Sequence, residues 1–193
     1  MKRKIPEVLT DDERAALLEA PSTRYPTGLR NLCMLRVMLD AGLRVGELVN
    51  LEPRDINMTS GKLHVHQGKG GKDRVLWLGE DDIELIGRWL EVRPRGKKLF
   101  TTLKGGPLDT RYIRAMVERV AARAGINRRI HPHLLRHSFA TDLLRDTGRL
   151  DLVQKALGHS SIQTTSIYLH LVDGELESAL KFFRAGPVTA PAI

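Results

Sequence analysis

The stretch LRNLCMLRVMLDAG, residues 29–42, decides the fold of this chain. It is strongly apolar, as expected of a helix that is surrounded by other elements rather than by water. Gly42 follows directly, and a glycine at this place is the usual left-handed cap of a helix C-terminus. Cys33 lies within the run and is interpreted as a small buried hydrophobe. The stretch therefore predicts a buried helix over residues 29–41.

Other helices are predicted before and after this one in the sequence. Thr10 and Glu13 have the spacing of a capping box, so a first helix begins there, and residues 21–28 form a loop. Periodic apolar positions, terminal glycines and prolines predict further helices at residues 45–51, 80–91, 109–124, 132–144, 150–157 and 175–183.

One pair of short strands is predicted near the middle of the chain. Leu63 and Val65 lie on one face of an alternating run, and Val75 and Trp77 belong to a second run. The glycine-rich and basic segment GKGGKD, residues 68–73, lies between the runs and is typical of a hairpin tip. The predicted fold class is α+β, mainly α with a small antiparallel β-sheet. No alternating series of strands and helices indicates a doubly wound fold.

The charge balance points to a polyanionic partner. The 193 residues carry a formal net charge of +8, and nucleic acid is the commonest partner of so basic a chain. An anionic membrane surface is the rival interpretation, but no apolar run is long enough to span a bilayer and no basic amphipathic anchor is evident. The single cysteine cannot form an intramolecular disulfide, so a reducing cytoplasm is the expected location.

Two segments place basic side chains where they can face an anion. His133 and Arg136 are three residues apart on a predicted helix and so share one face, although an ordinary basic surface is an equally good explanation of the pair. His137, in the same apolar helix, is expected to make a structural hydrogen bond. Arg44 follows the glycine cap of the central helix. Glu47 either orients a neighbouring cation or forms a surface ion pair.

Two further segments add to this set. Lys69 lies on the hairpin tip, which lacks the GxxxxGK[ST] pattern of a nucleotide-binding loop, so a lysine that enters a DNA groove or contacts a phosphate is favoured. Lys72 and Arg74 are predicted to contact the DNA backbone. His159 follows a helix-capping glycine, and Tyr168 comes nine residues later. A tyrosine can hold a phosphoryl group covalently, and fixed cations stabilise the charge of a phosphate in transition.

A catalytic metal is not expected. The histidine spacings do not match HExxH, one cysteine cannot build a zinc set, and the carboxylates fall mostly at helix starts. A two-metal nuclease would need clustered acids.

Taken together, four segments resemble the catalytic domain of the tyrosine recombinases, the family of phage integrases and Xer-type chromosome-resolution enzymes. The segments are AGLRVGELVNL (41–51), GKGGKDRVLWLG (68–79), HPHLLRHSFATDLL (131–144) and LGHSSIQTTSIYLHL (157–171). Their order and the interval from His159 to Tyr168 both agree with the family. The resemblance implies six catalytic residues, namely Arg44, Lys69, His133, Arg136, His159 and Tyr168, with Glu47 as a supporting acid.

The resemblance also implies a mechanism. Tyr168 attacks a DNA phosphorus, forms a 3′-phosphotyrosyl link and frees a 5′-hydroxyl, with neither metal nor ATP as cofactor. Lys69 is expected to protonate the departing oxygen, and His133 to assist proton transfer at Tyr168. The chain is then a site-specific recombinase or integrase. Relaxation of DNA by a type IB topoisomerase and a non-catalytic DNA-binding module are the alternatives.

The family usually carries an N-terminal core-binding domain that closes a clamp on DNA. The expectation here is a catalytic domain at residues 1–184 and a tail at 185–193, with the core-binding domain absent. Double-stranded DNA is the expected partner, and the nucleoid the expected place of action. The helix predicted at 175–183 is expected to dock on a neighbouring copy in a homotetramer on DNA, although packing on its own domain is nearly as good an explanation.

Overall fold

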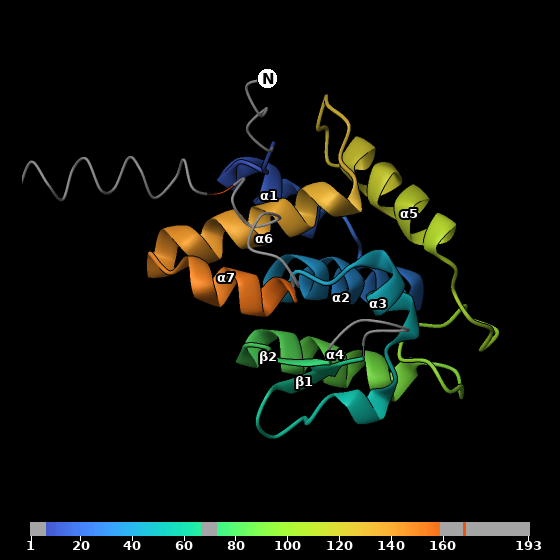
Figure 1. The fold of residues 1–193 in the computed structure, drawn as a ribbon. Coiled ribbons are helices and arrows are strands. Elements are labelled where there is room, and N and C mark those ends of the chain that lie inside the picture. The colour runs from blue at the N-terminus through green and yellow to red at the C-terminus, as the bar shows by residue number, and fades with distance from the viewer. Residues whose placement is uncertain (1–6, 67–72, 159–167, 169–193) are drawn as a thin grey trace, which may run out of the picture.

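The computed structural model describes residues 7–66, 73–158 and 168 (Figure 1). Within them, the fold is mainly helical with one small two-stranded antiparallel sheet, as predicted. The elements are α1 (Asp11–Glu19), α2 (Pro26–Ala41), α3 (Val45–Asn50), a 3-10 turn η1 (Pro53–Asp55), β1 (Lys62–Val65), β2 (Arg74–Trp77), α4 (Glu80–Val92), α5 (Thr110–Arg123), α6 (Pro132–Thr147) and α7 (Leu150–Leu157). The helix predicted at 175–183 lies outside the described residues.

Helix α2 is the central element, and its burial confirms the prediction from its apolar sequence. It packs against α4 on one side and α6 on the other (Figure 1). Cys33 of this helix is fully buried. The helix begins at Pro26, so the loop predicted at 21–28 extends too far. Proline suits a first helical turn. At Gly28 a Cβ would lie 1.9 Å from the Ser22 carbonyl oxygen, so the chain can turn tightly here only with glycine.

The helix termini follow the predicted caps. The Thr10 hydroxyl accepts a hydrogen bond from the Glu13 N–H (3.1 Å), and the Glu13 carboxylate accepts one from the Thr10 N–H (2.9 Å). Gly42 ends α2 with φ of +59° and lies directly against Phe139 of α6. A side chain at position 42 would collide with that ring, so glycine lets the C-terminus of α2 approach α6 closely.

The two strands pair antiparallel, with Leu63 opposite Leu76 and Val65 opposite Arg74. Leu63 and Val65 are buried, as predicted for the first run. The second run presents its other face to the core. Arg74 and Leu76 point inward, whereas the Trp77 residue is 65% exposed. The inward position of an arginine is explained by its partners in the site described next.

A small second core lies between α6 and α7. It consists of Ala140, Leu144, Val153, Leu157 and Tyr168. This cluster holds the tyrosine ring beside α6, the helix that also carries His133 and Arg136. No helix of the described part of the chain is long and apolar enough to cross a membrane.

Candidate active site

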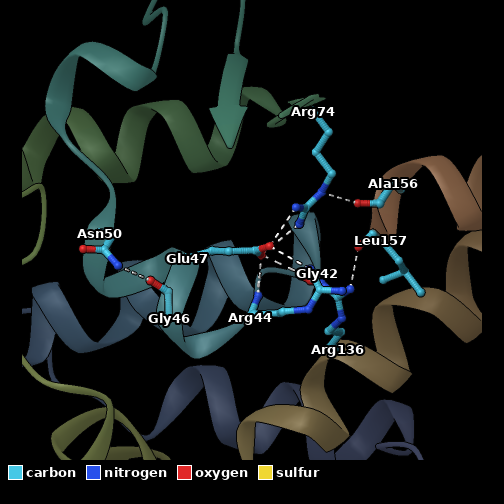
Figure 2. Close-up of polar contacts among 9 residues, drawn as sticks. All are labelled: Gly42, Arg44, Gly46, Glu47, Asn50, Arg74, Arg136, Ala156 and Leu157. Carbon is cyan, nitrogen blue, oxygen red and sulfur yellow. Dashed lines mark hydrogen bonds and ion pairs between the residues drawn. The ribbon is translucent and has the colours of Figure 1, made fainter. Parts of the chain in front are cut away.

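A single buried carboxylate, that of Glu47, organises the site (Figure 2). Glu47 lies in the first turn of α3, directly after the cap of α2. Its Oε2 accepts a hydrogen bond from the Arg44 backbone N–H at 2.7 Å, which satisfies a donor at the start of α3. The side chain is only 8% exposed. A carboxylate so deep in the protein needs partners, because an unpaired buried charge is costly.

Three arginines from separate elements supply those partners. Arg44 approaches Glu47 Oε1 with Nη1 at 3.0 Å, and Arg74 of β2 makes two parallel bonds of 2.8 and 2.9 Å. Arg136 of α6 has its Nη1 at 3.9 Å from Glu47 Oε2. The four side chains Arg44, Glu47, Arg74 and Arg136 are called the Glu47 cluster below.

Helix ends complete the arrangement. Arg136 donates to the Gly42 carbonyl at 2.5 Å and to the Leu157 carbonyl at 2.6 Å, and Arg74 Nε donates to the Ala156 carbonyl at 2.7 Å. These carbonyls belong to the ends of α2 and α7, where backbone acceptors lack helical partners and the helix dipole is negative. The two arginines therefore join the ends of two helices to the central carboxylate (Figure 2).

The cluster carries more positive than negative charge. Burial alone would raise the pKa of Glu47, but the hydrogen bonds and charge of Arg74, the Arg44 backbone donor and the charge of Arg136 lower it overall. Burial and the nearby Arg44 charge lower the pKa of Arg136 to about 10, so it stays protonated at neutral pH. Three guanidiniums thus face one carboxylate, and the Arg44 side chain is 40% exposed. Such a site favours an added anion.

Tyr168 is held on the same helix. The residue is only 1% exposed, and its hydroxyl lies 2.6 Å from Nδ1 of His137, the residue next to Arg136. Burial raises the pKa of Tyr168 to about 12, against the opposing charge of Arg136. Burial, then the charges of His133 and Arg136, lower the pKa of His137. A neutral imidazole therefore lies against a protonated phenol.

Comparison with known proteins identifies the family of the chain. The sequence model of the phage integrase family matches residues 7–175. The chain belongs to the phage integrase family. Tyrosine recombinase XerD of Staphylococcus saprophyticus is 38% identical over 188 residues, which are 94% of this chain and 63% of that protein. XerD of Staphylococcus aureus strain Mu50 matches to the same extent. The chain thus spans less than two thirds of the length of these relatives.

Solved structures of integrase-family proteins confirm the fold. The crystal structure of XerA recombinase has a TM-score of 0.80 and 34% identity, and the match covers 94% of this chain and 66% of that one. XerH site-specific recombinase, in a post-cleavage complex with palindromic difH substrate, has a TM-score of 0.77 and 33% identity, covering 94% and 54%. The expected recombinase catalytic-domain fold is therefore confirmed.

The structure of this integrase-family chain brings together part of the predicted site. Arg44 and Arg136 converge on Glu47, which lies in the interior and contacts these cations rather than forming a surface ion pair. His133 is exposed in the first turn of α6, with its ring centroid 6.4 Å from that of His131. Three predicted residues lie outside the described part of the chain, namely Lys69, Lys72 and His159.

The position of Arg74 corrects a prediction. A surface contact with the DNA backbone was expected, but the side chain is only 7% exposed and is paired with Glu47. Strand alternation could have indicated this burial, because Arg74 lies two residues before the buried Leu76 and therefore on the same face of the strand. His137 was expected to make a structural hydrogen bond, but its partner Tyr168 could not be foreseen, since no sequence spacing relates the two.

Within the described residues, no group of three His, Cys, Asp or Glu side chains could hold a metal ion.

Proposed function

We propose that this chain is the catalytic domain of a site-specific tyrosine recombinase that cleaves and rejoins double-stranded DNA through Tyr168. The observation that carries the proposal is the cationic surplus of the Glu47 cluster beside a buried tyrosine whose hydroxyl already contacts an imidazole. The similarity to XerD, and to XerH solved with its difH substrate, supports DNA as the polyanion. The net charge of +8 agrees with this partner and with association with the nucleoid.

Strand cleavage follows from the chemistry of these groups. The Tyr168 oxygen attacks a DNA phosphorus, so one O–P bond forms while the bond from phosphorus to the 5′-oxygen breaks. Arg44 and Arg136 stabilise the charge that gathers on the non-bridging oxygens. His159 donates a further hydrogen bond to them, and Lys69 gives its proton to the departing oxygen. Attack by a 5′-hydroxyl of another strand reverses the step, so the bond energy is retained without ATP or metal.

Two histidines compete for the phenolic proton. The family resemblance favours His133, which lies on the same helix as Arg136. In the described conformation, however, the Tyr168 hydroxyl lies against His137, whose lowered pKa keeps it neutral and able to accept a proton. His133 then acts only after Tyr168 has moved from its buried position to the phosphate.

A covalent capture experiment tests the proposal. The wild-type chain is incubated with end-labelled nicked duplexes of randomised core sequence, and denaturing gels reveal any protein–DNA adduct. We expect an adduct from the wild type and none from Tyr168→Phe, which loses only a hydroxyl. His133→Asn and His137→Asn, in the same assay, identify the histidine whose loss slows capture more. Retention of the adduct by Tyr168→Phe, or none from a wild type that still binds duplex, would contradict the proposal.

Assembly on DNA belongs to the same proposal. Copies of the chain are inferred to form a tetramer on DNA through residues 175–183, which lie outside the described residues. Sedimentation of DNA complexes of the chain truncated before Glu175 tests this inference, since unchanged association without the segment would contradict it.

A further inference from the structure

We propose that Arg74 is a positioning residue for strand cleavage, acting through Glu47 rather than on DNA. This inference rests on the proposed function and concerns a residue with no assigned role in it. Arg74 has the most extensive contact with Glu47 of the three arginines. It makes two bonds of 2.8 and 2.9 Å, whereas Arg44 makes one side-chain bond and Arg136 stays at 3.9 Å (Figure 2).

The geometry explains why this matters for the phosphate-binding arginines. Glu47 has two oxygens, and Arg74 occupies both with a planar fork whose bidentate fit fixes the carboxylate in one orientation. The same oxygens face Arg44 and Arg136. With Arg74 in place, the negative charge of Glu47 is largely neutralised by the Arg74 guanidinium. Without it, the carboxylate would draw Arg44 and Arg136 toward itself and away from a phosphate.

Arg74 also connects three parts of the site. It is the first residue of β2, five residues after Lys69 in the sequence. Its Nε binds the Ala156 carbonyl at the end of α7, three residues before His159. Its fork binds Glu47, which in turn holds Arg44. One side chain therefore sets the spacing between the strand that follows the lysine, the helix that precedes the histidine and the carboxylate beneath Arg44.

Three explanations of Arg74 make different predictions. A direct DNA contact would weaken binding and reduce the salt dependence of binding by about one unit of slope. A purely structural residue would lower thermal stability and leave the cleavage rate at saturating DNA unchanged. A positioning residue lowers that rate while the dissociation constant and the salt slope stay as in the wild type, because the misplaced groups act in the transition state.

The experiment compares Arg74→Lys and Arg74→Met with the wild type, on the duplex that the wild-type chain captures. Binding and its salt slope are measured in the Tyr168→Phe background, and cleavage as the single-turnover rate of adduct formation at saturating duplex. We expect Arg74→Met to cleave about 100-fold more slowly, the usual effect of a small misplacement. Arg74→Lys, which keeps the charge but not the fork, should lie between the two, with about a 10-fold loss.

Arg36→Met is the matched control. Arg36 pairs with the buried Asp82 at 2.7 Å, outside the Glu47 cluster, so its loss lowers stability without moving Arg44 or Arg136. Its cleavage rate should stay within about twofold of the wild type, since distant sites behave independently.

The outcomes separate the two proposals. Arg74 variants that cleave at the wild-type rate, or that show a reduced salt slope, overturn the inference while the recombinase proposal stands. Failure of the wild type to form any adduct overturns the recombinase proposal itself. If Arg74→Met does not fold, as judged by circular dichroism, the folded Arg74→Lys variant decides the question.

Discussion

Two arginine–carboxylate networks of this protein, each containing a buried carboxylate, have opposite charge balances. The Glu47 cluster sets three guanidiniums around one carboxylate. The second network, on α1, α2, α4 and α6, sets three guanidiniums among four aspartates and is called the Asp40 network. Its members are Arg14, Arg36, Arg145, Asp40, Asp81, Asp82 and Asp142. Similar bonds thus build one site with surplus positive charge and one with surplus negative charge.

The pKa directions follow this balance. In the Glu47 cluster the hydrogen bonds and charges of the arginines outweigh the effect of burial, so the pKa of the Glu47 carboxyl is lowered. In the Asp40 network burial, together with the charge of Asp82, raises the pKa of Asp40 to about 6, despite Arg36 and Arg14. A surplus of negative charge is relieved by binding a proton. A surplus of positive charge on arginines has no such relief, because guanidiniums do not give up protons at neutral pH. This difference is what we expect between a structural network and the phosphate site that we propose.

Glu47→Gln is expected to have the largest effect on stability. Glutamine keeps the shape of the side chain but removes the charge shared by the three arginines, two of which are themselves buried. Leaving buried guanidiniums without a counter-charge costs about 3–5 kcal/mol of unfolding free energy. Urea denaturation at pH 7 measures it. A loss no greater than that of Asp40→Asn would break the comparison between the networks.

Asp40→Asn should change the slope of stability with pH rather than its level alone. The folded pKa of Asp40 lies above its ordinary value of 3.8, at about 6, so the folded protein holds the proton more tightly. The associated stability is present below pH 3.8 and is lost as pH rises through 6. Relative to Asp40→Asn, the wild type should lose on the order of 3 kcal/mol across this window, since one pKa unit corresponds to about 1.4 kcal/mol. Parallel curves for the two proteins would show that Asp40 binds no extra proton.

Glu13→Gln is expected to have the smallest effect on stability, with a pH dependence opposite to that of Asp40→Asn. Glu13 pairs with Arg128 at 2.5 Å near the surface, and the Arg128 hydrogen bond, only partly opposed by burial, lowers its pKa to about 2. Its contribution is therefore complete above pH 4.5 and disappears as pH falls toward 2. A pair this exposed contributes about 0.5–1 kcal/mol. Denaturation of both proteins from pH 7 to 2 should show the difference closing, and a difference that grows in acid would reverse the assigned sign.

The sequence predicted the helices and strands better than it predicted which side of each faces the core. The capping box at Thr10, the buried α2 and its Gly42 cap were foreseen because each depends on local geometry. The extra turn at Pro26 was not, because Gly28 is needed there for contact with Ser22, which pattern alone does not reveal. The inward side of β2 was missed as well, since Arg74 looked like a surface residue until its buried partner was known.

What the sequence by itself determined is the family and the order of the helices, and it supplied the residues that we propose to act on a phosphate. Motif spacing and helix capping depend on residues that are close together in the sequence, so they can be recognised without the tertiary structure. Only the tertiary structure decided that Arg74 serves Glu47 and that the Tyr168 hydroxyl lies against His137. These pairs join residues 27 and 31 positions apart, and which partner a buried charge or hydroxyl finds depends on how the helices pack.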